Sequence, residues 1–147
     1  MTTSPPLARL LDRTADAVAA VRAGRSLTEA LEATDPELRP GVLALASDVM
    51  RRLGTALALR ARLAPRTPPA PVDALLLSAL ALMVPPEGGI APYADHTLVD
   101  QSVTAVRHRT PAAAGFVNAV LRRFVRERAG LVDAVLHQDV AAFNHPQ

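Results

Sequence analysis

Apolar side chains recur at intervals of three and four residues through most of this chain, and prolines and glycines divide the pattern into segments. That spacing is typical of amphipathic helices. The first segment begins near Pro6, which suits a first helical turn, and ends at Gly24, which suits a helix C-terminus. Ser26 and Glu29 then occupy the two ends of a capping box, so a short second helix is predicted to start there.

A third helix is predicted to start at Asp35 and Pro36, which have the residue types of an N-cap and a first helical position. A Pro-Gly pair interrupts this helix, so its continuous part is predicted to run from about Gly41 to Leu63. Gly54 lies within that part and indicates a bend or a close contact.

The middle of the chain consists of a proline-rich linker and a very apolar run. The linker is "APRTPPAP" (residues 64–71), which is predicted to be extended because each residue before a proline avoids the α region. The apolar run "ALLLSALALMV" (residues 74–84) is shorter than the roughly 20 residues of a membrane span, so it predicts a buried core helix and no membrane partner. A further helix is predicted from Asp95, a plausible cap, to about His108.

The C-terminal part predicts two more helices. Thr110 and Pro111 open the first, which contains "AAAGFVNAVLRRFVRER", and Gly130 is predicted to end it; a last short helix follows over residues 131–143. No alternating strand pattern exceeds four residues, and no repeat of solenoid period is present. The sequence therefore predicts a single all-α domain over residues 1–147, a bundle of about seven helices that the linker could divide into two small sub-bundles.

Composition supports the helical prediction and excludes some chemistry. Half of the residues are apolar, Ala and Leu supply most of them, and the chain has no Cys and no Trp. Ala and Leu are strong helix formers. The absence of Cys excludes disulfides, thiolate zinc sites and a cysteine nucleophile, and it is compatible with a reducing cytosol. We therefore expect a cytoplasmic protein.

All sixteen basic residues are Arg, although the net charge is only +2. Arg keeps its charge and offers a flat fork of donors that suits phosphate. A genome rich in G and C would produce the same bias without any function. The positions of the arginines therefore matter more than their number.

The quoted helix separates its apolar and basic residues. At about 100° per residue, the apolar side chains between residues 116 and 125 cover about half of the circumference. Arg122, Arg123 and Arg126 share the remaining arc, with Glu127 as the single acid nearby. A phosphate backbone would offset the repulsion between these arginines, so the arc predicts an RNA-binding surface. Arg near a helix C-terminus also complements the macrodipole, and Arg stems can cover apolar surface.

Two further pairs could extend this surface, namely Arg107 with Arg109 and Arg51 with Arg52. The chain lacks the aromatic platforms of proteins that read single strands, so binding is expected to be directed at the backbone or the shape of the nucleic acid. Asn118 borders the apolar face and is predicted to be a buried amide that ties two loops or helices together.

Other chemistry receives little support from the sequence. His96 follows Asp95 but has no second ligand at i+3 or i+4, so no metal site is predicted. The acids Asp12, Asp16, Glu29 and Glu32 are interpreted as parts of solvated faces. No Ser-His-Asp spacing, phosphate loop or paired-carboxylate constellation is recognisable. We expect this chain alone to be no enzyme and to hold no cofactor.

Two motifs carry a resemblance to a known family. "LVDQSV" (Leu98 to Val103) and "GFVNAVLRR" (Gly115 to Arg123) resemble motifs of the NusB-like helical domain, in the version found at the N-terminus of RsmB-type (Fmu/Sun) ribosomal RNA cytosine-C5 methyltransferases. The second motif is quite specific and includes Asn118, whereas the first is weak by itself. Free-standing NusB transcription factors usually have "NGVLD" where this chain has "NAVLRR", which favours the methyltransferase branch.

The resemblance implies an RNA-binding domain that helps a catalytic half dock on small-subunit ribosomal RNA. That half would supply an S-adenosylmethionine site and the cysteines that attack cytosine, and this chain contains neither. The implied partners are ribosomal RNA and the protein's own catalytic domain. Two alternatives stay open: a free-standing NusB-like antitermination factor that binds a ribosomal protein, and a purely intramolecular role in which the arginines face the catalytic half.

Overall fold

The computed structural model describes residues 4–85 and 93–143, which contain seven α-helices, one 3-10 turn and no strand. The elements are α1 (Leu7–Arg22), α2 (Leu27–Glu32), α3 (Arg39–Arg51), α4 (Leu53–Leu63), α5 (Ala70–Met83), α6 (Asp95–Arg109), η1 (Pro111–Ala113) and α7 (Ala114–Phe143). The predicted all-α bundle of about seven helices is confirmed. No helix among these residues combines the length and the apolar character needed to cross a membrane.

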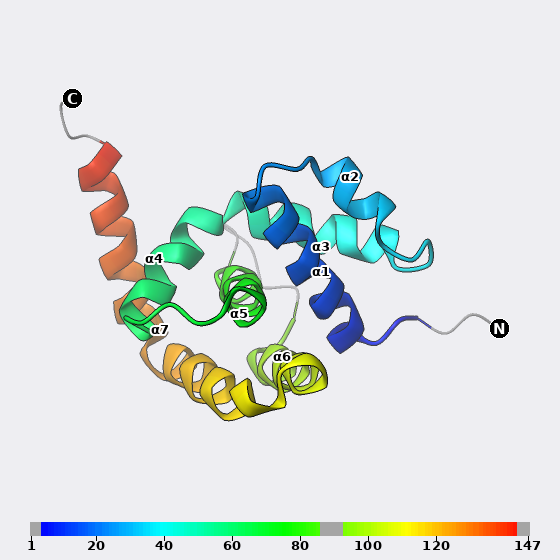
Figure 1. Cartoon of the computed structure of the whole chain (residues 1–147). Helices are drawn as coiled ribbons and strands as arrows, with labels where there is room; N and C mark the ends of the chain where they lie inside the picture. Colours follow the sequence, from blue (N-terminus) through cyan, green and yellow to red (C-terminus); the bar gives the residue numbers. More distant parts are fainter. Residues whose placement is uncertain (1–3, 86–92, 144–147) are drawn as a thin grey trace.

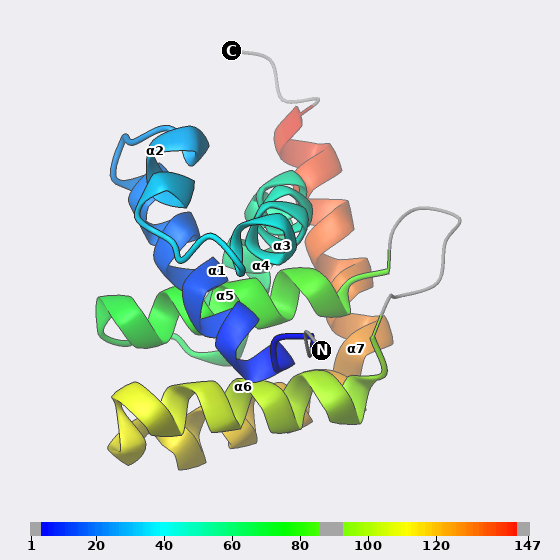
Figure 2. The same cartoon turned by 90° about the vertical axis from the view of Figure 1, so that its right-hand side faces the viewer.

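Helix α5 is the centre of the bundle (Figures 1 and 2). Every residue from Val72 to Met83 is buried, because α1, α3, α4, α6 and α7 all pack against this helix. A helix that is apolar on all sides must be covered on all sides, so the prediction of a buried core helix is confirmed. The main hydrophobic cluster contains residues from both sides of the linker, so the linker does not separate the described helices into two bundles with cores of their own.

A smaller cluster joins α1, α2 and α3, and its members are mostly small. It consists of Ala17, Ala30, Leu38, Val42 and Ala46. At Gly41 a Cβ atom would lie 2.7 Å from Cδ2 of Leu10, so α1 and α3 approach closely at this glycine. Pro40 and Gly41 are the second and third residues of α3, so the Pro-Gly pair does not interrupt this helix.

The turn between the first two helices follows the sequence prediction. Gly24 has a φ of 102°, the left-handed conformation that favours glycine after a helix. The Ser26 side chain accepts a hydrogen bond from the Glu29 amide at 3.1 Å, which confirms Ser26 as the N-cap of α2.

The predicted start of the third helix is wrong. Residues 36–38 form a turn, and α3 begins only at Arg39. The Asp35 carboxylate accepts a hydrogen bond from Arg9 of α1 at 3.1 Å and caps no helix. Arg39 in turn donates to the carbonyls of Leu31 and Thr34, both at 2.9 Å, and so satisfies groups at the end of α2.

The predicted continuous helix from Gly41 to Leu63 is also wrong, because it is broken at Arg52. This residue has φ −117° and ψ 15°, outside the helical range, and α3 and α4 meet there. Gly54, which indicated a bend, lies two residues further on and weakens the helix locally. The break allows α4 to pack against both α5 and α7.

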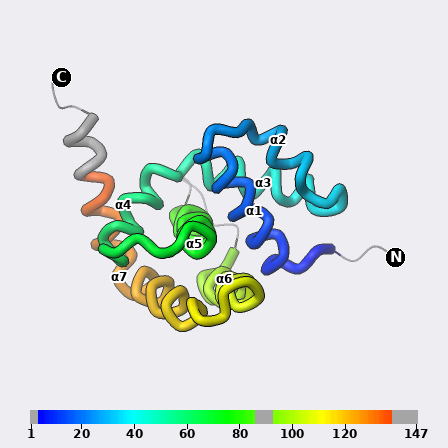
Figure 3. The backbone as a smooth tube through the Cα atoms, in the orientation of Figure 1, coloured from blue at the N-terminus to red at the C-terminus, as the bar shows by residue number. Residues whose placement is uncertain are grey.

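Two helix boundaries in the second half also differ from the prediction. Asp95 is the first residue of α6 and Ala94 is its N-cap, so Asp95 does not cap this helix. Gly130 does not end a helix, because the two predicted C-terminal helices form one helix, α7, which runs to Phe143. Gly130 keeps a negative φ, and α7 bends near its middle (Figures 1 and 3). Bends of this kind are common at glycine.

An ion pair connects α4 to the start of α5 across the proline-rich linker. Arg60 Nε lies 3.0 Å from Asp73 Oδ1, and the two side chains are only 13% and 8% exposed. Arg60 Nη1 also donates to Thr67 Oγ1 of the linker at 3.2 Å. Burial raises the pKa of Asp73, and the charges of Arg60 and Arg22 partly oppose that shift.

Replacing Gly130 by Ala should stabilise the protein. Its Cβ would meet no atom within 4 Å, and Ala is the better helix former, so we expect Gly130→Ala to raise the free energy of unfolding by about 0.5–1 kcal/mol in urea titrations. Gly24→Ala is the control and should lower the free energy of unfolding by about 1 kcal/mol, because a side chain is strained at the positive φ of Gly24. Shifts of the urea midpoint in the same direction for both variants would contradict the helical position of Gly130.

Removing one partner of the Arg60–Asp73 pair should cost more than removing both. Arg60→Met leaves a buried carboxylate without its counter-ion, and we expect a loss of about 3–5 kcal/mol at neutral pH. The double variant Arg60→Met/Asp73→Leu should return to within about 1–2 kcal/mol of the original protein, because two apolar side chains need no compensation.

The loss in Arg60→Met should also depend on pH. Without Arg60 the pKa of Asp73 rises further, so the folded state holds a proton that the unfolded state releases. The stability of Arg60→Met should therefore fall as the pH rises from about 4 to 7. The double variant lacks this carboxylate and should not show that part of the slope. Equal losses in the single and double variants would refute the pairing.

Candidate nucleic-acid interface

Helices α6 and α7 lie side by side and form the surface on which the predicted binding residues converge (Figure 1). The helices are antiparallel: Arg128 of α7 pairs with Asp95 at the start of α6, while Gly115 and Asn118 of α7 lie near Arg107 at the end of α6. Arg128 also lies over the Phe124 ring, 5.3 Å from its centre. These contacts fix the relative position of the two helices.

The buried face of α7 is narrower than the sequence predicted. Val117, Val120, Leu121 and Phe124 are buried in the core, as expected from their helical spacing. Phe116, which was placed on the same apolar face, is 41% exposed. It lies at the edge of the apolar arc, in the first turn of a helix that begins at Ala114.

Two of the three arginines of the predicted arc are exposed without an acidic partner. Arg122 Nε donates to Asn118 Oδ1 at 3.0 Å, one turn earlier on α7. Arg126 is exposed and makes no ion pair with the residues that the structure describes. Arg123 differs, because its Nε lies 2.8 Å from Glu127 Oε2 on the same helix. Glu127, the single acid that the sequence placed near the arc, therefore neutralises Arg123.

Asn118 has a different role from the one predicted. Its side chain is partly exposed, and it holds Arg122 rather than tying two segments together in the core. Gly115 lies beside it at the start of α7, and a Cβ there would meet no atom within 4 Å. Close packing therefore does not explain this glycine.

A groove runs between α6 and α7 and consists of two adjoining hollows of about 380 and 370 Å³ that share Asp100. We call it the α6–α7 groove. The first hollow is lined by Asp95, His96, Val99, Asp100, Arg122, Val125 and Arg126. The second is lined by Asp100, Val103, Thr104, Arg107, Ala114, Gly115 and Asn118.

Positive charge exceeds negative charge along the α6–α7 groove. Three guanidinium groups line it, those of Arg107, Arg122 and Arg126. Of its two carboxylates, Asp95 is already paired with Arg128, and only Asp100 has no ion pair within the described part of the chain. The groove therefore suits an anionic ligand that spans both hollows.

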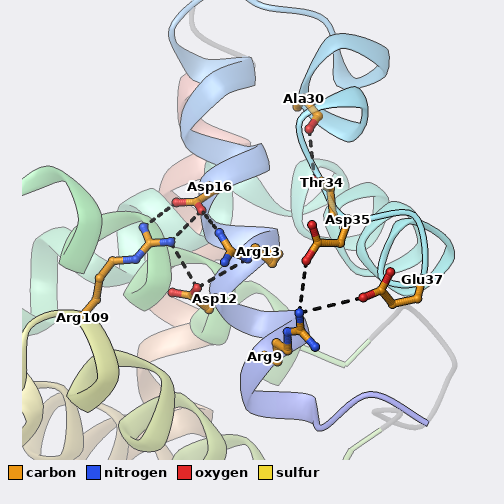
Figure 4. A network of polar contacts seen from close by, with 9 residues as sticks. All are labelled: Arg9, Asp12, Arg13, Asp16, Ala30, Thr34, Asp35, Glu37 and Arg109. Atoms are coloured by element: carbon orange, nitrogen blue, oxygen red, sulfur yellow. Dashed lines mark hydrogen bonds and ion pairs between the residues drawn. The ribbon is translucent and has the colours of Figure 1, made fainter. Parts of the chain in front are cut away.

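Arg109, the neighbour of Arg107 in the predicted pair, is held by α1 (Figure 4). Its guanidinium contacts both oxygens of Asp16 at 2.6 and 2.7 Å and Asp12 at 3.1 Å. These bonds raise the pKa of Arg109, and Arg13 contacts the same two acids. Asp12 and Asp16 are partly exposed, as their interpretation as solvated acids requires, but they also connect α1 to α6, which the sequence did not predict.

The predicted pair Arg51 and Arg52 is not brought to this surface. Both lie where α3 meets α4, and α5 separates that junction from α6 (Figures 1 and 2). Arg51 forms an ion pair with Asp48 one turn earlier. Arg52 makes no ion pair with any described residue. Their predicted role in RNA binding remains a prediction, but it would need a second surface.

Two residues of "LVDQSV" were not singled out in the sequence. Gln101 Oε1 of α6 accepts a hydrogen bond from the Ala8 amide at 3.1 Å. This bond satisfies a backbone N–H group in the first turn of α1, which has no partner within its own helix. Asp100, the residue before it, is exposed and lines the α6–α7 groove. The available signal was the polar Asp-Gln pair between buried apolar residues, which marks two positions of one helix outside the core.

No metal site is recognisable among residues 4–85 and 93–137, where no three His, Asp or Glu side chains gather. His96 is exposed at the edge of the α6–α7 groove. A scan against protein-family models finds none that matches this chain, and a search of curated proteins finds no significant match.

Proposed function

We propose that the α6–α7 groove binds RNA through its phosphate backbone. The observation that carries this proposal is the excess of unpaired guanidinium groups along the groove: Arg122 and Arg126 on one wall, Arg107 on the other, and a single unpaired carboxylate. Elsewhere on the described surface many arginines are bound by acids, as Arg9, Arg13 and Arg109 are.

The spacing of the arginines suits a strand of phosphates. Arg122 and Arg126 lie four residues apart on α7, about 6 Å along the helix axis. Successive phosphates of a strand rise by about 3.4 Å along a duplex axis and follow a longer path around it, so one phosphate can face each guanidinium. The hydrogen bond from Arg122 to Asn118 restrains one of these donors before the ligand binds.

The lining of the groove predicts that RNA is bound with little sequence preference. Its apolar members are aliphatic or small, neither hollow is lined by Phe, Tyr or Trp, and His96 is the one ring in the lining. Bases therefore have at most a single imidazole ring on which to stack. Contacts to phosphate position a nucleic acid but carry no sequence information.

We further propose that this RNA-binding chain serves as the N-terminal docking domain of an S-adenosylmethionine-dependent cytosine-C5 methyltransferase of small-subunit ribosomal RNA. The support is the resemblance of "LVDQSV" and "GFVNAVLRR" to that family. Both motifs contribute residues to the α6–α7 groove, Asp100 from the first and Asn118 from the second.

The reading frame of the gene tests the methyltransferase proposal. A frame that continues past Gln147 into a glycine-rich cofactor motif after a strand, and then a Pro-Cys motif, is the expected result. A stop codon directly after Gln147 would overturn this proposal and favour the free-standing NusB-like factor. It would leave the proposal of RNA binding untouched.

Charge reversal tests the α6–α7 groove as the RNA contact. We expect the protein to bind fluorescent fragments of small-subunit ribosomal RNA with a slope of log K against log salt of about −2, for three contacted phosphates. Arg122→Glu/Arg126→Glu should weaken binding at least about tenfold and reduce the slope to about −0.7. Anisotropy titrations at several salt concentrations measure both quantities.

The matched control is Arg25→Glu/Arg66→Glu, which makes the same charge change at two exposed arginines outside the groove and without an ion pair in the described residues. Helical circular dichroism should stay unchanged in both double variants. Equal losses of affinity in the two variants would show that the contact face is misassigned. If the unmodified protein does not bind RNA even at low salt, the proposed function is wrong.

A further inference from the structure

The carboxylate of Asp100 lies where the proposed ligand would pass. Asp100 is exposed on α6 and lines both hollows of the α6–α7 groove, between Arg107 in one hollow and Arg122 in the other. Its backbone carbonyl accepts a hydrogen bond from Thr104 at 2.9 Å, but its carboxylate has no hydrogen bond or ion pair with a described residue. Its acceptor oxygens therefore face the groove with no partner there.

A carboxylate at this point is unfavourable for a simple phosphate-binding surface. An ionised Asp only accepts hydrogen bonds, and it repels the phosphates that Arg107 and Arg122 would hold on either side of it. A ligand that offers a hydroxyl or amino donor between two successive phosphates would offset this repulsion with a hydrogen bond to the carboxylate. We therefore expect the groove to favour ligands that alternate negative groups with donors.

We propose that Asp100 selects RNA over DNA by accepting a hydrogen bond from a ribose 2′-hydroxyl group. This inference rests on the proposed function. Every ribonucleotide carries one 2′-hydroxyl between its own phosphate and the next, whereas deoxyribose has no donor there. A DNA strand in the same groove experiences the repulsion without the compensating hydrogen bond. Asp100 is thus a specificity-determining residue, and the arginines supply the affinity.

The ratio of RNA to DNA affinity isolates this hydrogen bond. The probes are oligouridine RNA and the matching oligodeoxyuridine of about 15 nucleotides, which lack exocyclic amino groups and differ only in the sugar. The protein should bind the RNA about tenfold more tightly at one fixed salt concentration. Asp100→Ala should reduce this ratio to nearly one, mainly by strengthening DNA binding. The repulsion between Asp100 and the phosphates acts on RNA and DNA alike, so it cancels in the ratio of the two affinities.

Two controls separate the 2′-hydroxyl from other causes. Glu32→Ala removes an equal charge from an exposed position of α2, which packs against α1 and α3, and should leave the ratio unchanged. Oligouridine with 2′-O-methyl groups keeps the ribose oxygen but loses the donor, so it should bind the unmodified protein as weakly as DNA does.

Each outcome assigns the failure to one of the two proposals. No binding of either strand at low salt overturns the proposed function itself. Tight binding of RNA and DNA with equal affinities, or a ratio that Asp100→Ala leaves unchanged, overturns the role of Asp100 and leaves RNA binding in place. Selective binding of cytosine- or adenine-containing strands in preference to oligouridine would assign Asp100 to a base amino group and would also overturn the role proposed here.

Discussion

The whole arrangement follows from one helix that cannot face water. Apart from Asp73 and Ser78, helix α5 is apolar around its full circumference, so other helices must remove every side of it from solvent. Helices α6 and α7 each turn an apolar face to α5 and also pack against each other. Their polar sides then meet along one line at the surface. The α6–α7 groove arises because two helical segments cover α5 side by side. The residues of these segments that line the groove are mostly charged or small.

Local sequence signals were sufficient where no distant partner competed with them. The capping serine at Ser26, the left-handed Gly24 and the buried α5 were all predicted correctly from patterns within a few residues. The errors arose where a tertiary contact took a residue for another purpose. Asp35 has the side chain of a helix cap but pairs with Arg9 of another helix. Gly130 has the residue type of a helix end, yet it lies inside α7, where packing of both halves maintains the helix.

The same limit applies to the binding surface. The helical repeat placed Arg122 and Arg126 on the polar side of α7, and both are exposed. The repeat could not show that Arg109 is bound by Asp16, because 93 positions separate them in the chain. It marked Asp100 only as a polar position of its helix, because the role of this carboxylate depends on which arginines surround it. A sequence shows which side of a helix is polar, but only the fold shows which charges are already neutralised.

One consequence follows from the continuity of α7. Its first half forms a wall of the α6–α7 groove, and its second half packs beside α4 and projects past it (Figure 1). The helix is continuous through the bend, so no loop separates the two halves. Arg126 belongs both to the lining of the groove and to the turns of α7 that lie beside Arg62 of α4. The contact of α7 with α4 therefore helps to fix where the arginines of the groove stand.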